Sequence, residues 1–249
     1  MRSGNLSLAV LIHGQKGSME AREYVSPQDR HTYIEGREGS NFTLRIRNGS
    51  SRRVLAVISV DGLSVLDGKP AGIKSGGFIL DPYGSIEVPG WMLNSQEAAK
   101  FFFAGRTEKG DASYVAQIGG DTANKGVIGV IFLGEVPSIP DIRDFRERSV
   151  MFSAPRGSVL RASAASASPS SPDMQVGAQS LGAGFGEASE FRTRQGDFRR
   201  GSEMVRILLH YDDARGLKRR GIDVSKPLAQ PSAFPADERG CTPPPGWGS

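Results

Sequence analysis

The sequence predicts a mainly β protein: an antiparallel β-sandwich of the jelly-roll type, with a long extended arm and a C-terminal strand–helix element. Short apolar segments recur through the first 135 residues, each bounded by Gly, Pro, Asp or Asn, with little helical periodicity between them. The stretch 153–189 is instead dominated by Ser, Ala, Gly and Pro and is too poor in large apolar residues to form a core. We therefore expect a sandwich domain at 1–150, an arm or linker at 151–200, a returning strand and short helix at 201–225, and a Pro-rich extended tail at 226–249.

The opening residues, MRSGNLSLAVLIHG, indicate a first strand. They do not form a clear signal peptide, because the apolar part is short and no small-residue cleavage pattern follows it. The next strand, NFTLRIRNGS (41–50), shows period-two alternation, with Phe42, Leu44 and Ile46 on one face and Thr43, Arg45 and Arg47 on the other. The following Asn-Gly pair predicts a hairpin to RRVLAVISV (52–60).

Further strands are expected in GGFILD (76–81), GSIEVPGW (84–91), KFFFAG (100–105), SYVAQIG (113–119) and GVIGVIFLGEV (126–136). In KFFFAG, alternation should place two phenylalanines in the core and one on the other face. The segment NSQEAAKF (94–101) predicts a single helical turn capped by Asn94 or Ser95.

The C-terminal element starts with EMVRILLHYD (203–212), where Val205, Ile207, Leu209 and Tyr211 alternate and Leu208 takes the opposite face. A short helix follows, with Asp212 or Asp213 at its N-cap and Gly221 just past its end.

Two Asp-Gly pairs, Asp61-Gly62 and Asp67-Gly68, stand six residues apart between apolar runs. Asp-Gly supplies the positive φ of tight turns, and Asp81 before a proline indicates another turn. The alternative interpretation groups Asp61, Asp67 and Asp81 as calcium ligands, although the EF-hand spacing is absent. A carboxylate pair of the glycosidase kind is a further alternative, because such enzymes need two carboxylates on opposite sides of a bond.

Other chemical signatures are incomplete. The Gly-rich GLSVLDGKP (62–70) has five residues between its glycines where a Walker A motif has four, and GAGFGE (182–187) follows a linker where a dinucleotide site needs a strand. The three histidines are far apart in sequence. We expect no cofactor. Tyr83 and Trp91 stand at strand ends or loops, which makes them the candidate residues for contact with a sugar or a protein.

Charge, hydropathy and cysteine content limit which classes of partner the chain can have. The net charge is +4, and acidic and basic residues are interleaved, so we expect no specific nucleic-acid binding. The longest apolar run, residues 127–133, is far shorter than the roughly 20 residues needed to span a bilayer. The single cysteine, Cys241, excludes an intramolecular disulfide. A location in a virion or in the cytoplasm is expected.

Five segments carry a resemblance. VISVDGLSVLDGKPAG (57–72), GFILDPYGSIEVPGW (77–91), GVIGVIFLGE (126–135), LGAGFGE (181–187) and LLHYDDARGLKRRGI (208–222) resemble a set of bacterial and phage-encoded β-sandwich proteins of uncharacterised function. The likeness covers about residues 30–135 and 180–222. It implies a sandwich with a returning C-terminal strand, and it implies no reaction.

Taken together, these features predict a non-enzymatic structural or interaction protein, a multi-copy capsid, decoration or tail-associated component of a phage virion or similar particle. Its partners would be proteins of that assembly, including further copies of itself as a homo-oligomer. The alternatives are a carbohydrate- or protein-binding sandwich module built around Tyr83 and Trp91, and a metal-dependent enzyme built on the three aspartates.

Overall fold

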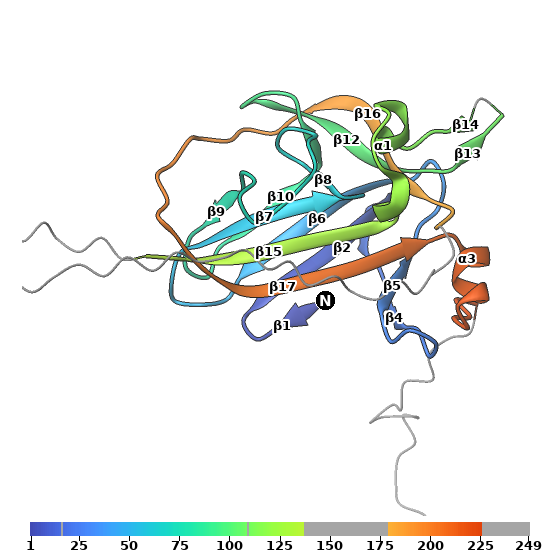
Figure 1. Cartoon of the computed structure of the whole chain (residues 1–249), viewed down its shortest axis with the longest axis horizontal. Coiled ribbons are helices and arrows are strands. Elements are labelled where there is room, and N and C mark those ends of the chain that lie inside the picture. The colour runs from blue at the N-terminus through green and yellow to red at the C-terminus, as the bar shows by residue number, and fades with distance from the viewer. Residues whose placement is uncertain (16, 109, 137–178, 226–249) are drawn as a thin grey trace, which may run out of the picture.

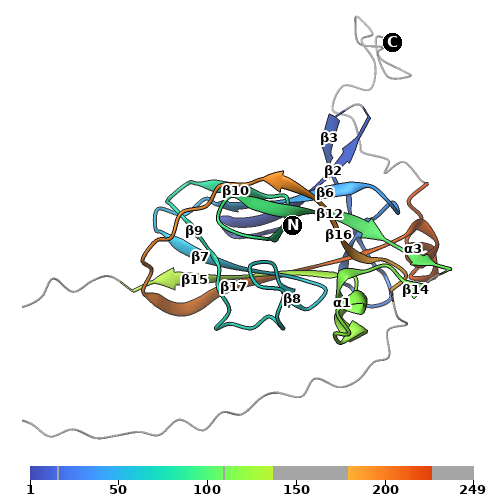
Figure 2. The ribbon, with the colours of Figure 1, turned by 90° about the horizontal axis from the view of Figure 1, so that it is seen from above.

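Two antiparallel sheets pack face to face and enclose one large apolar core (Figure 1). The computed structural model describes residues 1–15, 17–108, 110–136 and 179–225. The view from above separates the two layers, with β6, β10 and β12 in one and β7, β15 and β17 in the other (Figure 2). The mainly β, antiparallel sandwich is confirmed, whereas the jelly-roll connectivity stays a prediction.

The first layer, sheet A, holds β1 (Arg2–Ser3), β2 (Leu6–Gly14), β3 (Gly17–Glu20), β6 (Asn41–Asn48), β10 (Ser85–Val88), β11 (Gly90–Met92), β12 (Glu97–Ala104) and β16 (Gly182–Glu190). Strand β2 pairs with β1, β3 and β6. Strand β6 also pairs with β10, and β12 pairs with β6, β11 and β16.

The second layer, sheet B, holds β4 (Glu23–Val25), β5 (Thr32–Glu35), β7 (Val54–Val60), β8 (Leu63–Ser64), β9 (Phe78–Leu80), β15 (Val127–Glu135) and β17 (Arg200–Asp212). Its order is β4-β5-β17-β15-β7-β8, with β9 beside β7. The β5–β17 pair is parallel and every other pair in the described sheets is antiparallel. Outside the two sheets lie the hairpin β13 (Arg106–Thr107) and β14 (Gly110–Asp111), the helices α1 (Tyr114–Gln117) and α3 (Ala214–Arg219), and the 3-10 turn η1 (Thr122–Asn124).

The alternation expected in the strands fills the core. Phe42, Leu44 and Ile46 of β6 are buried, and so are Phe101 and Phe103 of β12, while Phe102 remains partly exposed on the other face. The rings of Phe42 and Phe103 stack with their centroids 4.5 Å apart. Both predictions, for 41–50 and for the three phenylalanines, are therefore confirmed.

The predicted Asn-Gly hairpin is wrong, because β6 and β7 belong to different sheets. The side chain of Asn48 is buried, and its amide donates to the carbonyl oxygens of Arg52, Leu80 and Asp81. Its Oδ1 accepts from the backbone N–H of Ser50. These bonds turn the chain out of sheet A and into sheet B, so the dipeptide makes a corner between layers.

The helical turn predicted at 94–101 is also wrong. Asn94 Oδ1 accepts from the backbone N–H groups of Gln96 and Glu97, as an N-cap would, yet Glu97 begins β12. Ala98 and Ala99 are both buried within sheet A. A strand buried on both faces loses the polar alternation by which strands are recognised, which is why it resembled a helix start.

The strand predicted at 113–119 is a single turn of helix, α1. Gln117 N–H donates to the carbonyl of Ser113, and Gly119 ends the turn with a φ of 70°. Only Val115 of the helix is buried, so the segment contributes one core residue and not an alternating face.

The arm predicted at 151–200 is wrong for residues 182–190, which form β16 and pair with β12 from Ala104↔Gly182 to Glu97↔Glu190. The glycines that resembled a dinucleotide motif have a packing role. A Cβ on Gly184 would lie 2.1 Å from the ring of Phe102, so the missing side chain makes room for that ring. Residues 153–178 of the low-complexity stretch, and the tail at 226–249 with Cys241, lie outside the described residues.

The returning strand and helix are confirmed. Strand β17 enters sheet B between β5 and β15, with Leu208 exposed and Leu209 buried. Asp213 caps α3 by accepting from the N–H of Gly216, and Gly221 follows the helix with a φ of 76°. Among the described helices, none has both the length and the apolar character to cross a membrane.

Candidate functional site

Asp61 is a buried structural carboxylate and not a surface ligand. It lies in the two-residue turn between β7 and β8, where Asp61 and Gly62 have φ values of 51° and 80°. Its Oδ1 accepts from Gly126 N–H at 2.7 Å and from the Tyr211 hydroxyl at 2.6 Å, and its Oδ2 accepts from Ala183 N–H at 2.7 Å. Burial raises the pKa of Asp61 to about 6, against the lowering effect of these hydrogen bonds. One side chain thus ties the end of β7, the residue before β15, and β17 of sheet B to β16 of sheet A.

The other two aspartates serve turns, as the turn interpretation expected. Asp67 Oδ1 accepts from Lys69 N–H, and Gly68 beside it has a φ of 65°. Asp81 is exposed, and its carbonyl accepts from Gly84 N–H across the next turn. Within the described ranges, no group of three or more His, Cys, Asp and Glu side chains could hold a metal ion. Asp61, Asp67 and Asp81 are therefore not brought together as the metal hypothesis requires.

Trp91 was predicted to contact a ligand, and this is wrong because its side chain is 2% exposed. The indole packs edge-on against Phe101, and its Nε1 donates to the carbonyl of Gly184 in β16. The Pro-Gly pair before Trp91 indicated a loop, but residues 90–92 form a short strand, β11, whose tryptophan points into the core.

Tyr83, in contrast, is 66% exposed, in a turn between β9 and β10. Pro82 precedes Tyr83. The φ of Tyr83 is 59°, which lies in the left-handed region that Gly or Asn normally occupies. Such strained positions gather at functional sites, so an exposed aromatic residue held there marks a candidate contact. Tyr83 and Trp91 do not form a shared surface, since one lies outside the fold and the other inside it.

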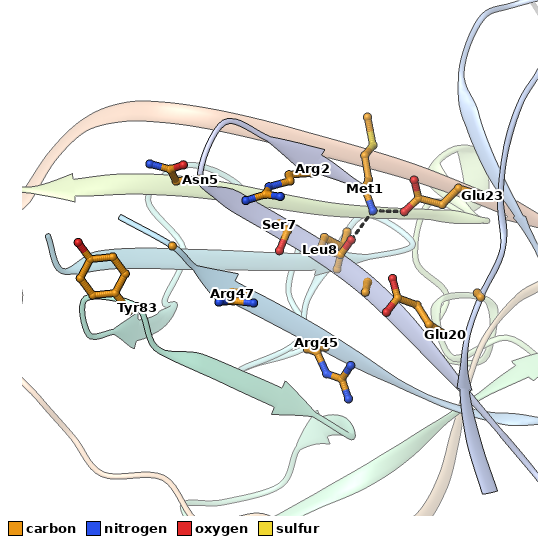
Figure 3. A pocket seen from close by; sticks show the side chains of 13 residues that line it. Met1, Arg2, Asn5, Ser7, Leu8, Glu20, Glu23, Arg45, Arg47 and Tyr83 are labelled. Carbon is orange, nitrogen blue, oxygen red and sulfur yellow. Dashed lines mark hydrogen bonds and ion pairs between the residues drawn. The ribbon is translucent and has the colours of Figure 1, made fainter. Parts of the chain in front are cut away.

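Tyr83 lines one end of a groove of about 690 Å³ on the outer face of sheet A (Figure 3). A row of directly paired residues, Arg2↔Ser7 and Ser7↔Arg47, crosses its floor, and the row continues beyond the groove to Ser85, which pairs with Arg47. Directly paired residues of an antiparallel sheet project on the same face. Glu20 and Glu23 lie toward the opposite end of the groove, away from Tyr83 (Figure 3).

The arginines of the groove differ in how they are held. Arg45 is engaged by Glu87, with both Nε and Nη2 at 2.8 Å from Oε1. Arg2 donates from Nε to the carbonyl of Gly4, and Arg47 has no hydrogen-bond or carboxylate partner in the described part of the chain. The alternation of 41–50 predicted that Arg45 and Arg47 face outward, but only the register between strands shows that Arg2 and Ser7 join them.

The outer face of sheet B carries exposed apolar residues where the groove on sheet A carries charged and polar ones. Its rows Ser59–Gly129–Leu208 and Val57–Ile131–Arg206 border a shallow hollow of about 150 Å³ that Ile73 also lines. Leu208 and Ile73 are 48% and 44% exposed, and Met204 on the same strand is 47% exposed. We call Ile73, Ile131, Met204 and Leu208 the apolar strip.

Comparison of the chain with models of known protein families, with curated proteins and with solved structures finds no match.

Proposed function

We propose that this protein is a non-enzymatic structural and interaction protein that works as one of many copies in a larger assembly, such as a phage virion. The observation that carries this proposal is the apolar strip on the outer face of sheet B. Large apolar side chains clustered on an otherwise polar exterior are typical of surfaces that bind proteins. The particle class rests on the resemblance to phage-encoded sandwich proteins.

We assign a second copy of this chain as the occupant of the apolar strip. Arg206 borders the same hollow as Leu208 and forms an ion pair of 3.0 Å with Glu203, so the face carries both signs of charge along with its apolar residues. A symmetric contact between two copies needs such a self-complementary surface, because the same patch on each copy faces the same patch on its partner.

The test is sedimentation of the full chain, free and in a source lysate fractionated on a density gradient. We expect self-association and co-migration with a particle at stoichiometric abundance. Leu208→Asp should weaken both, since it places a charge within an apolar contact. Met19→Asp is the matched control, because Met19 is also an exposed methionine, 75% accessible, but it lies on β3 of sheet A and not on sheet B. A monomer that remains at the top of the gradient, or equal effects of the two variants, would overturn the proposal.

A further inference from the structure

We propose that the groove on sheet A binds an acidic saccharide, with Arg2 and Arg47 holding its carboxylate or sulfate group and Tyr83 packing against a sugar ring. The site uses no residue of the apolar strip, so it stands independently of the proposed function. The two outer faces of the sandwich would then have separate tasks, one in assembly and one in recognition.

The charge of the groove supports an anionic ligand. Arg47 has no partner within the described residues, and Arg2 uses only Nε, on a backbone carbonyl. The two residues flank Ser7 in one cross-strand row, so their Cα atoms lie two strand spacings, about 10 Å, apart. Two long side chains at that separation can converge on a single acidic group from both sides. Guanidinium groups suit carboxylates and sulfates because they donate parallel, charge-assisted hydrogen bonds.

The polar groups beside the arginines suit sugar hydroxyls. Ser7 belongs to the same row as the two arginines, and Asn5 lines the groove next to it. Hydroxyl and amide side chains both donate and accept, which matches the mixed hydrogen-bonding character of a saccharide.

Tyr83 supplies the flat apolar surface that a pyranose ring needs. Its ring is exposed at the groove end nearest Asn5, in a turn where the φ of Tyr83 is 59° (Figure 3). Tyrosine combines an apolar face with a polar tip, so it can pack on the C–H face of a sugar while remaining hydrated.

The acidic end of the groove limits the ligand further. Glu20 would repel a chain with an acid at every residue, whereas Glu23 is already paired with the N-terminal ammonium group of Met1 in the same groove. A saccharide in which an acidic sugar alternates with a neutral one places a single negative charge between the arginines and keeps the next charge away. This pattern favours a saccharide over a uniformly acidic peptide.

The experiment is calorimetric titration of the full chain with four probes of similar length: a hyaluronan hexasaccharide, a keratan hexasaccharide sulfated only on its glucosamine residues, neutral chitohexaose and hexaglutamate. We expect one or both acidic saccharides to bind, and the first two probes separate carboxylate from sulfate recognition. Arg47→Ala should weaken binding about tenfold or more, and Arg47→Lys should weaken it less, because charge remains but the paired donors are lost. Tyr83→Ala should weaken binding of the saccharides as well.

Arg194→Ala is the matched control, since Arg194 is an exposed arginine without a hydrogen bond or ion pair in the part of the chain described. It should leave the affinity unchanged, and thermal melting should show that every variant remains folded. The proposal is overturned if Arg194→Ala weakens binding as much as Arg47→Ala, or if no probe binds at millimolar concentration. It is also overturned if chitohexaose binds as tightly as the acidic saccharides, or if hexaglutamate binds more tightly than they do. None of these outcomes bears on self-association, so the two proposals fail separately.

Discussion

The hydroxyl of Tyr211 donates to Asp61 Oδ1 over 2.6 Å, although 150 residues separate the two in the chain. Both side chains are buried, and the same carboxylate accepts the N–H groups of Gly126 and Ala183. The Asp-Gly turn that the sequence pattern indicates is therefore also the point where strands from both sheets are joined. Three hydrogen-bond donors, two of them backbone groups, depend on this one acceptor.

Asp61 should make the protein less stable as the pH rises. Its pKa is about 6 in the folded state, above the ordinary value of 3.8, so the folded chain binds the extra proton between these two values. The favourable contribution is fully present below pH 4 and is lost as the pH rises through 6, with a size of about 3 kcal/mol. Chemical unfolding from pH 4 to 7 measures it, and Asp61→Asn should remove this part of the pH dependence.

Other groups contribute to the same profile. Burial lowers the pKa of His210 to about 4, and this has the opposite sign, because the folded state then loses stability as the pH falls below about 6.5. The informative quantity is therefore the difference between the wild type and Asp61→Asn at each pH. A difference that does not vary with pH would contradict the assignment to Asp61.

Tyr211→Phe should lower the free energy of unfolding by about 1–3 kcal/mol, because the core packing stays while the carboxylate loses one of its donors. The Tyr211 hydrogen bond lowers the pKa of Asp61, so its removal should also move the pH midpoint upward. Urea unfolding of the variant over the same pH range tests both effects. A loss of stability with no shift of the midpoint would show that the hydroxyl does not act through Asp61.

Gly184→Val should destabilise the fold by about 1–3 kcal/mol, since the added side chain meets the ring of Phe102. The double variant with Phe102→Ala should lose less than the sum of the two single changes, which a double-mutant cycle measures. Gly72→Ala is the control, because no atom lies within 4 Å of its added Cβ. If the effects of Gly184→Val and Phe102→Ala simply add, the cost of the valine does not come from a clash with the ring of Phe102.

Tyr83→Asn should be more stable than Tyr83→Ala by about 1 kcal/mol, although both remove the ring. Asn tolerates the left-handed φ of 59° better than Ala does. Thermal unfolding compares them, and both should lose saccharide binding equally. An alanine variant as stable as the asparagine variant would mean that the turn relaxes once the ring is gone.

The sequence predicted the strands whose two faces differ, such as β6 and β17, because alternation records which side meets the core. It failed where both faces are buried, as at Ala98 and Ala99 of β12, and where glycines make room for a ring, as at Gly184 of β16. In both cases the neighbouring strand decides the structure, and local pattern carries no information about that neighbour.

The candidate sites show the same division. Turn chemistry at Asp61, Asp67 and Asp81 could be predicted, since an Asp-Gly or Asp-Pro pair acts locally. The burial of Trp91 and the row from Arg2 to Ser85 could not, because both depend on register between strands far apart in the chain. Of the predicted contact residues, only Tyr83 lies where a partner can reach it.

The position of β17 has a consequence for biosynthesis. Residues 200–212 fill the place between β5 and β15, so a growing chain that has already released both of those strands still lacks the one that joins them. Until that strand emerges from the ribosome, two strand edges in the middle of sheet B remain open to pairing with other chains. A ribosome that stops before residue 200 would therefore leave a product prone to aggregation, even though most of the sandwich had been synthesised.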